Sequence, residues 1–377
     1  MPVETQFLRR DDLLRAATSA GFSTLTERQM EEFRYDGLMP RPVRVGNDGH
    51  RPVWLHPSGS DHQLVRLLRW REHTRDRDVL RVVLWVEGFS VVLDDVRASA
   101  TAVMDNLSHG LEQILGAEAS RQGLDPVDDK DTVVGGVAAT MAAMRGKNAL
   151  PRPIRVPAGE RATAVAHLVQ IFGLGTQPDL AEAEAQTIEK VLGVSPGRRQ
   201  SLEGAEPWLT GPASALNGAA DFVSVPRMAE ALADATDAAW QEARSPTAAL
   251  FLQLPVSTRA LAALTGKDNF AGMGGTIEWD SEPLVAIILI AFVLGARESD
   301  WYDNIRDLSD ALASWPVLVG EMKSVLDMPQ HQLTRNLAGR GPEIEARTHR
   351  IIQALLDGGL DPSPRSVTKT GTTNSRS

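Results

Sequence analysis

Apolar residues at the start of the chain recur at helical spacing in short segments that glycine and proline interrupt. The first segment has a narrow apolar stripe that includes Leu13 and Ala17, and Gly21 follows it. Apolar residues three or four positions apart lie on one face of a helix, and glycine commonly ends one. The pattern therefore predicts a short helix over residues 11–20.

A second apolar stripe follows a short polar turn. Met30 and Phe33 lie three positions apart, on one face of a helix. Either Thr24 or Thr26 can cap its amino end, and Gly37 can end it in a left-handed conformation. The prolines that follow prevent the helix from resuming. Two short helices joined by a turn form a helix-turn-helix, whose second helix commonly reads the DNA major groove.

Apolar and polar residues alternate after these prolines, with the period of a β-strand. The alternating apolar positions are Val43, Val45, Val53 and Leu55, on either side of Asn47, Asp48 and Gly49. A turn of this composition predicts a β-hairpin, and Pro52 makes at least one strand an edge strand. A hairpin after a recognition helix is a wing, which lies against phosphates or a minor groove.

Two more helices are predicted within the first hundred residues. Ser60 and Gln63 have the spacing of a capping box, so we expect a helix to open there. Its apolar face consists of Leu64, Leu67 and Leu68. A fourth stripe, closed by Gly88, consists of Val79, Val82, Val83 and Val86. We expect Trp70 to belong to the core.

The remainder of the chain is predicted to be almost entirely helical. Residues 98–121 form a longer amphipathic helix, and proline and glycine break the periodicity in two predicted linkers, 122–131 and 146–160. Prolines commonly lie in the first turn of a helix. On this ground helices are expected to open at Pro178, at Ser245–Pro246 and at Pro342, the last ending at Gly358.

Two further segments stand out by composition. The longest apolar run, residues 284–296, has 13 residues. A membrane-spanning helix needs ~20, so the run predicts a buried central helix and no membrane partner. The last residues, 361–377, are small, polar and poor in apolar side chains, and we expect them to be disordered.

Charge is distributed unevenly along the chain. Residues 1–100 contain fifteen arginines, no lysine and fifteen acidic residues, whereas the rest holds 24 basic and 34 acidic residues, which accounts for the net charge of −10. A nucleic-acid partner must therefore meet the arginine-rich front, because phosphate contacts need local positive charge. The alternative is that these arginines pair with carboxylates on ordinary helix surfaces.

The absence of cysteine limits the kinds of chemical site that the chain can contain. The chain has no cysteine, which excludes disulfides, thiolate catalysis and cysteine-bound metal. No secretory segment is visible among the first thirty residues, and we expect a cytoplasmic protein.

The front of the chain resembles the DNA-binding domain of MerR-type transcriptional regulators over about residues 8–97. It is most similar to actinobacterial MerR-like proteins with a long helical C-terminal region. The residues that carry the resemblance are Ala17 and Gly21-Phe22-Ser23, then Arg28, Met30, Phe33, Gly37-Leu38 and Pro40, then Gly49-His50-Arg51 and Gly88-Phe89-Ser90. The chain departs from the family at Glu31, where a basic residue is common, and at Glu32, where an aromatic one is.

The resemblance implies a mainly α-helical protein whose N-terminal module is a MerR-like winged helix-turn-helix. Its expected parts are the winged module at 1–97, a connecting or dimerisation helix at 98–124, an all-helical effector or partner domain at 125–360, and the tail. The connecting helix implies a homodimer. Alternatively, this helix packs on the downstream domain, and Gly110 weakens a coiled coil.

The candidate DNA contacts come from the second helix and the hairpin. In the helix they are Thr26, Arg28, Gln29, Arg34 and Tyr35, and in the hairpin they are Arg41, Arg44, His50 and Arg51. Several have another possible role. Arg28 can pair with Glu31 or Glu32, Arg34 can pair with Glu31, and Tyr35 can pack internally or reach a phosphate. The hairpin arginines have few nearby acids apart from Asp48, which favours phosphate contact.

No constellation of catalytic residues is visible. Gly193–Gly197 has the spacing of a nucleophile elbow, but Pro196 has no N–H to donate to an oxyanion. Residues 270–276 lack the lysine of a P-loop and the glycine spacing of a dinucleotide loop. We therefore expect no enzyme, no catalytic residues, no cofactor and no metal. Aromatic residues around the apolar run, expected in the core although they could line an effector pocket, are Trp279, Trp301, Tyr302 and Trp315.

These observations predict a DNA-binding transcriptional regulator of MerR-like type. Its partners would be double-stranded DNA, a second copy of the chain, and a small-molecule or protein effector at the helical domain. The alternative is a protein-interaction adaptor that kept the winged fold and lost DNA binding, which Glu31 and Glu32 favour.

Overall fold

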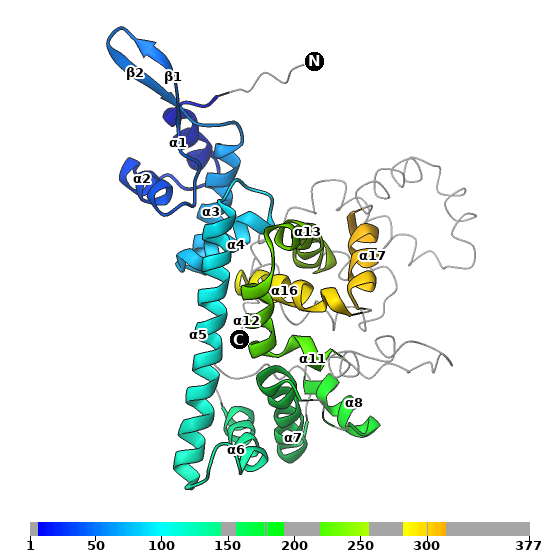
Figure 1. Cartoon of the computed structure of the whole chain (residues 1–377). Coiled ribbons are helices and arrows are strands. Elements are labelled where there is room, and N and C mark those ends of the chain that lie inside the picture. Colours follow the sequence, from blue (N-terminus) through cyan, green and yellow to red (C-terminus); the bar gives the residue numbers. More distant parts are fainter. Residues whose placement is uncertain are drawn as a thin grey trace, which may run out of the picture. The chain divides into compact units, whose positions relative to one another are not determined.

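The chain is mainly helical in a computed structural model that describes residues 7–144, 156–176, 178, 180–191, 219–255, 282–299 and 301–313. All of them belong to the first of two compact units, Met1–Trp315, and the second unit, Pro316–Ser377, lies outside them. Figure 1 shows the elements. The N-terminal elements are α1 (Arg10–Ser19), α2 (Glu27–Tyr35), β1 (Val43–Asp48), β2 (Arg51–Leu55), α3 (Ser60–His73), α4 (Arg77–Val86) and α5 (Leu93–Gln122).

Helices and helical turns make up the rest of the described chain. They are α6 (Lys130–Ala143), α7 (Ala158–Val169), η1 (Gln170–Leu174), α8 (Glu182–Val191), α11 (Ala220–Val223), α12 (Val225–Asp234), α13 (Asp237–Ala248), η2 (Ala249–Gln253), α16 (Leu284–Gly295), η4 (Ala296–Glu298) and α17 (Trp301–Ala313).

The first two helices form where the apolar stripes predict them. Leu13 is fully buried in α1, and Met30 and Phe33 are buried in α2. Thr26 caps α2, because its hydroxyl accepts a hydrogen bond from the backbone N–H of Gln29 at 3.2 Å. Glycines with positive φ follow both helices, as the sequence predicts.

The hairpin also forms, although its turn lies later than expected. Asn47 and Asp48 are still paired in β1, opposite Pro52 and Arg51, so the two-residue loop consists of Gly49 and His50. Gly49 has a φ of 60°, which a tight hairpin loop favours and which costs glycine little.

The expected capping box at the start of α3 is wrong. Gly59 precedes the helix in a left-handed conformation and provides no side-chain cap. Ser60 donates its hydroxyl to the carbonyl of Pro57, and Gln63 donates its amide to the carbonyl of Leu38 at 2.8 Å. Both side chains are buried, and they satisfy carbonyls of neighbouring segments, so they cannot cap their own helix.

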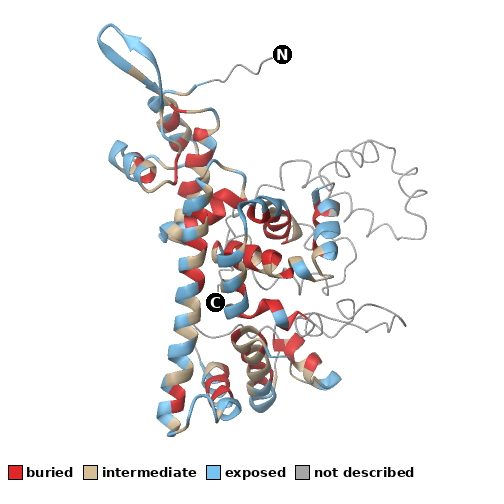
Figure 2. Cartoon of the chain, in the orientation of Figure 1, coloured by how far each residue is buried: buried red, intermediate tan, exposed pale blue. Residues whose placement is uncertain are grey.

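One apolar core joins the N-terminal elements to α11–α17, as the buried residues in Figure 2 show. It contains the predicted valine face of α4, and Trp85 of that helix packs edge-on against Trp240 of α13, with ring centroids 5.9 Å apart. Trp70 is only 3% exposed and stacks on Phe251, which confirms its place in the core. The two regions therefore share buried surface, which dominates folding free energy.

Arg244 of α13 reinforces this junction. Its guanidinium donates to the carbonyls of Trp85 at 2.7 Å and Phe89 at 3.2 Å, and it lies over the Trp85 ring. Each of these carbonyls also accepts a backbone N–H, from Gly88 and Val91, so the arginine adds a charged hydrogen bond to both.

The long helix α5 begins at Leu93 rather than at residue 98, and it continues past Gly110 without a break. Its early start is favoured by Asp94 and Asp95, because acidic residues in the first turn interact well with the helix dipole. Ile114 of this helix remains 53% exposed.

A second apolar cluster joins α6, α7 and α8 and contacts Leu115 of α5. Between α5 and α6, the described loop agrees with the predicted linker at 122–131, since α6 begins at Lys130. At the end of α5, Glu118 is buried, and hydrogen bonds from Arg121 and Gln122 lower its pKa to about 2.

Two of the proline-based predictions are wrong. Pro178 lies before α8, which begins at Glu182. Pro246 lies inside α13, whose cap is Thr236. A proline cannot donate the usual i to i−4 hydrogen bond, and here the helix changes to a π-helical segment, η2, three residues later.

The apolar run forms the buried helix α16, as predicted. Among the described residues, no helix has the length and apolar character that crossing a membrane requires. Trp301 and Tyr302 pack against the core, which confirms packing for these two aromatic residues. The remaining predictions lie outside the described residues: Trp279, Trp315, residues 193–197 and 270–276, the helix from Pro342 to Gly358, the tail, and most of linker 146–160.

Adjacent glycines in α6 give a matched test of its packing on α5. A Cβ added at Gly136 would overlap the Glu118 carboxylate and the Gln122 amide, whereas at Gly135 it would meet open space. Gly135→Ala should raise the free energy of unfolding by up to about 1 kcal/mol, because alanine favours helices. Gly136→Ala should lower the thermal unfolding midpoint, and equal midpoints for the two variants would contradict this packing.

Arg244→Ala tests the junction between α13 and α4. The variant leaves two carbonyls without their charged donor, so we expect about 2–3 kcal/mol of destabilisation, measured by thermal or denaturant unfolding. Arg227→Ala is the control, because Arg227 lies on exposed α12 surface and pairs only with Glu230 among the described residues. A loss no larger than the control's would show that the junction contributes little.

Candidate nucleic-acid interface

The outer face of α2 is exposed and carries mostly charged side chains. They are Glu27, Arg28, Glu31 and Glu32, and Tyr35 completes the face at its end. Tyr35 is 93% exposed, so it does not pack internally and its hydroxyl faces solvent. An exposed helix face of this kind can approach a groove, provided that its charges suit the partner.

Both arginines of α2 have carboxylate partners. The Nε of Arg28 lies 3.1 Å from a carboxylate oxygen of Glu32, and Arg34 lies 3.3 Å from Glu31. Helix pairs of this exposed kind contribute only about 0.3–0.5 kcal/mol. A phosphate can therefore replace Glu32 at small cost, because the Arg28 side chain is 88% exposed, whereas that of Arg34 is only 25% exposed.

Thr26 and Gln29 are engaged with each other. Besides the cap, the Gln29 side-chain oxygen accepts hydrogen bonds from the backbone N–H and the hydroxyl of Thr26, at 2.9 Å and 3.1 Å. A base contact by either side chain would have to replace or share these hydrogen bonds. Arg28 and Tyr35 are therefore the least constrained of the predicted α2 contacts.

The hairpin presents cations without ion pairs. Arg41, Arg44 and Arg51 are exposed, and none of them pairs with a carboxylate in the described part of the chain. Arg44 donates to the side-chain oxygen of Asn47 at 2.6 Å, which orients the guanidinium without neutralising it. His50 lies beside Arg51 in the exposed loop. These side chains form the most positive part of the candidate interface.

Other N-terminal arginines serve the fold. Arg66 pairs with the buried carboxylate of Glu87 and lies over the Trp70 ring. Arg71 lies over the ring of Phe33. Both arginines are therefore used in contacts within the module.

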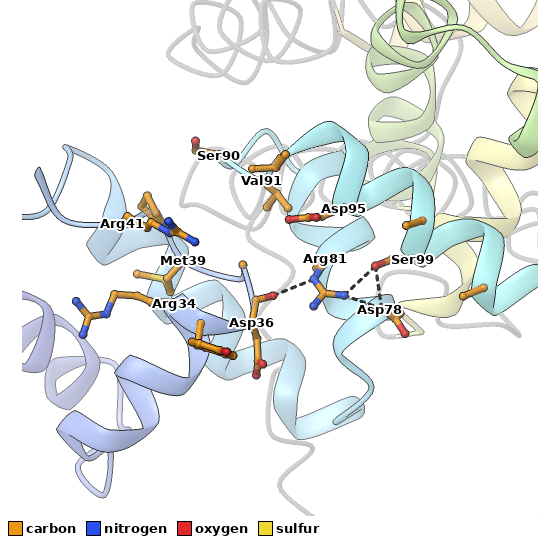
Figure 3. Close-up of a pocket in the computed structure, with 16 residues that line it drawn as sticks. Arg34, Asp36, Met39, Arg41, Asp78, Arg81, Ser90, Val91, Asp95 and Ser99 are labelled. Carbon is orange, nitrogen blue, oxygen red and sulfur yellow. Dashed lines mark hydrogen bonds and ion pairs between the residues drawn. The ribbon is translucent and has the colours of Figure 1, made fainter.

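A cleft of about 830 Å³ separates the end of α2 from the start of α5 (Figure 3). At its base, Arg81 of α4 donates to the carbonyl of Asp36 at 2.9 Å, to Asp78 at 2.6 Å and to the hydroxyl of Ser99 at 3.0 Å. Arg41 lines the same cleft. Because Arg81 contacts residues of three segments, it fixes the end of α2 relative to α4 and α5.

Sequence reasoning missed Arg81 and also His56. His56 follows β2, is 4% exposed, and exchanges two backbone hydrogen bonds with Leu8, the residue that precedes α1 by two positions. Its Nδ1 and the Nε of Arg34 are buried without hydrogen-bond partners among the described groups. No local sequence pattern marks Arg81 or His56, because the contacts of each side chain depend on tertiary packing.

No protein-family model, no curated protein and no solved structure matches this chain. Among the described residues, no group of three or more histidine or acidic side chains is placed to hold a metal ion.

His56 makes the stability of the module depend on pH. Burial, and then the charge of Arg34, lower the pKa of His56 below its usual 6.5. The folded state therefore favours the neutral ring. The contribution of this preference to the stability of the folded state is complete above pH 6.5. It declines as the pH falls below that value, until the His56 ring is also protonated in the folded state.

Thermal unfolding at pH 7.5, 6.5 and 5.5 checks this effect. The His56→Gln variant should lose less stability over that range than the unmodified chain. His62→Gln is the control, because the His62 side chain is 83% exposed. If His56→Gln and the unmodified chain lose the same stability, protonation of His56 is not the cause.

Proposed function

We propose that the chain is a DNA-binding transcriptional regulator of MerR-like type, in which α2 is the recognition helix and the β1–β2 hairpin is the wing. The observation that carries the proposal is the exposed, positively charged surface of the hairpin. Arg41, Arg44 and Arg51 lie on it without carboxylate partners in the described part of the chain. Unpaired arginines with few acids around them are suited to phosphates.

In this proposal the hairpin anchors the protein and α2 reads sequence. The guanidinium groups of the hairpin bind phosphates on one strand, and Arg28 exchanges Glu32 for a phosphate or a guanine edge. The exposed hydroxyl of Tyr35 donates to a neighbouring phosphate. Glu31 and Glu32 restrict the bases that α2 accepts, because a carboxylate can accept a hydrogen bond only from a donor such as cytosine N4.

The helical region would set the spacing or the occupancy of the bound protein. It packs directly on α4 through Trp240 and Arg244, so a change within it reaches the module that carries α2. The proposal includes a homodimer through α5, on which Ile114 is half exposed. It also includes a small-molecule or protein effector at the helical region, and a cytoplasmic location, which the lack of cysteine suits.

A second candidate is a protein-interaction adaptor that does not bind DNA. The observation that favours it is the charge balance of α2, where Arg28 and Arg34 both have glutamate partners. In that case the exposed carboxylates would repel the DNA backbone, and the outer face of α2 would meet a protein.

Titration of the full chain onto a DNA duplex at several salt concentrations separates the two candidates. A regulator should show log affinity falling steeply with log salt, because phosphate contacts release counterions. Arg41→Ala or Arg44→Ala should each reduce that slope by about one unit. Arg227→Ala, which removes an exposed arginine of α12, should leave the slope unchanged. Absence of binding at low salt would exclude the regulator and favour the adaptor.

A further inference from the structure

An exposed tryptophan lies on the hairpin where the strand pattern would normally place a polar residue. Along β2, Val53 and Leu55 are partly covered, whereas Pro52 and Trp54 are exposed. Successive side chains of a strand point to opposite faces, so Trp54 belongs to the solvent face. It is 54% exposed, the largest side chain among the exposed apolar residues of the hairpin.

Trp54 shares this face with a cation. Arg44 is its cross-strand partner, and Asn47 is the partner of Pro52. Directly paired residues of an antiparallel sheet lie side by side on one face. The residues Arg44, Asn47, Pro52 and Trp54 therefore form one surface, here called the Trp54 face.

The Trp54 face suits a ligand that offers both negative charge and apolar surface. Asn47 accepts a hydrogen bond from Arg44 at 2.6 Å, so the guanidinium is already oriented. Residues 41–55 carry three arginines and one aspartate, a positive local charge in a chain whose total is −10. An exposed indole gains free energy when apolar surface covers it, and a polyanion would complement the arginines.

We infer that the Trp54 face binds nucleic acid, with the indole against sugars and base edges and Arg44 on an adjacent phosphate. This inference rests on the proposed function and adds a contact outside the predicted set of residues. Aromatic side chains bind nucleotides largely independently of sequence, because every nucleotide offers apolar surface. Trp54 thus supplies the part of the affinity that salt does not screen, whereas the arginines supply the part that it does.

An anionic membrane surface is the other ligand that combines charge with apolar area. Binding to it needs a broad apolar face of several large side chains. The loop of the hairpin is Gly49-His50, and Asn47 and Pro52 flank it, so Trp54 has no large apolar neighbour on its face. This composition favours nucleic acid.

The test compares Trp54→Ala, Trp54→Phe and Arg44→Ala in the full chain, titrated onto a DNA duplex over a range of salt concentrations. We expect Trp54→Ala to weaken binding roughly tenfold at every salt concentration with an unchanged slope. Trp54→Phe should recover most of the loss. Arg44→Ala should instead reduce the slope by about one unit. Val127→Ala, at a 79% exposed apolar residue between α5 and α6, is the control and should have no effect.

Three results would overturn the inference, and each is distinct. Tight duplex binding that is equal in Trp54→Ala and the unmodified chain removes the role of Trp54 and leaves the proposed function intact. No duplex binding by the unmodified chain at low salt removes both. Binding to phosphatidylserine vesicles that Trp54→Ala abolishes, without any effect of this variant on DNA, assigns the Trp54 face to a membrane.

Discussion

The arrangement of the described chain depends on how the carboxyl end of α4 is closed. Backbone N–H groups of the turn at Gly88 donate to the carbonyls of Leu84 and Trp85, and this turn leads directly to α5. Arg244 adds a second, charged donor to the carbonyls of Trp85 and Phe89 from a distant helix, and it lies over the Trp85 ring. Burial lowers the pKa of this arginine, which shows the cost of its position, while the carbonyls and the indole offset that cost. A neutral side chain could not satisfy these acceptors as strongly.

The same junction controls where the candidate interface lies. Arg97 near the start of α5 donates to the carbonyl of Ala235 and pairs with Asp237, so α5 is held against α12 and α13. Arg81 then joins α5 and α4 to the carbonyl of Asp36, immediately after α2. Charged side chains on backbone carbonyls thus connect the helical region to the end of α2. The exposed face of α2 keeps its orientation because its far end is held in this way.

Local patterns in the sequence predicted the elements, and tertiary contacts decided the rest. The stripes of α1, α2 and α4 are local patterns, and these helices formed as expected. The hairpin also formed, with its turn later than predicted. The capping box failed because the Ser60 hydroxyl donates to the nearby carbonyl of Pro57, while the buried Gln63 amide donates to the distant carbonyl of Leu38. Pro246 was read as a helix start, but packing of α13 kept it inside the helix. Arg244 and His56 have no sequence signal, whereas Trp54 had one: it lies between Val53 and Leu55, where alternation would place a polar residue.

Charge determines which part of this surface can meet a polyanion. The total charge of −10 would repel DNA at a distance, but exposed charges are screened beyond about 8 Å in physiological salt. Local charge therefore decides the contact. On α2, three glutamates face two arginines, so this helix alone attracts DNA weakly. The hairpin has three arginines against Asp48, and it adds the apolar surface of Trp54. In the proposed regulator, affinity would therefore come mainly from the hairpin. The role of α2 would be to discriminate between sequences, because its carboxylates accept hydrogen bonds from few base donors.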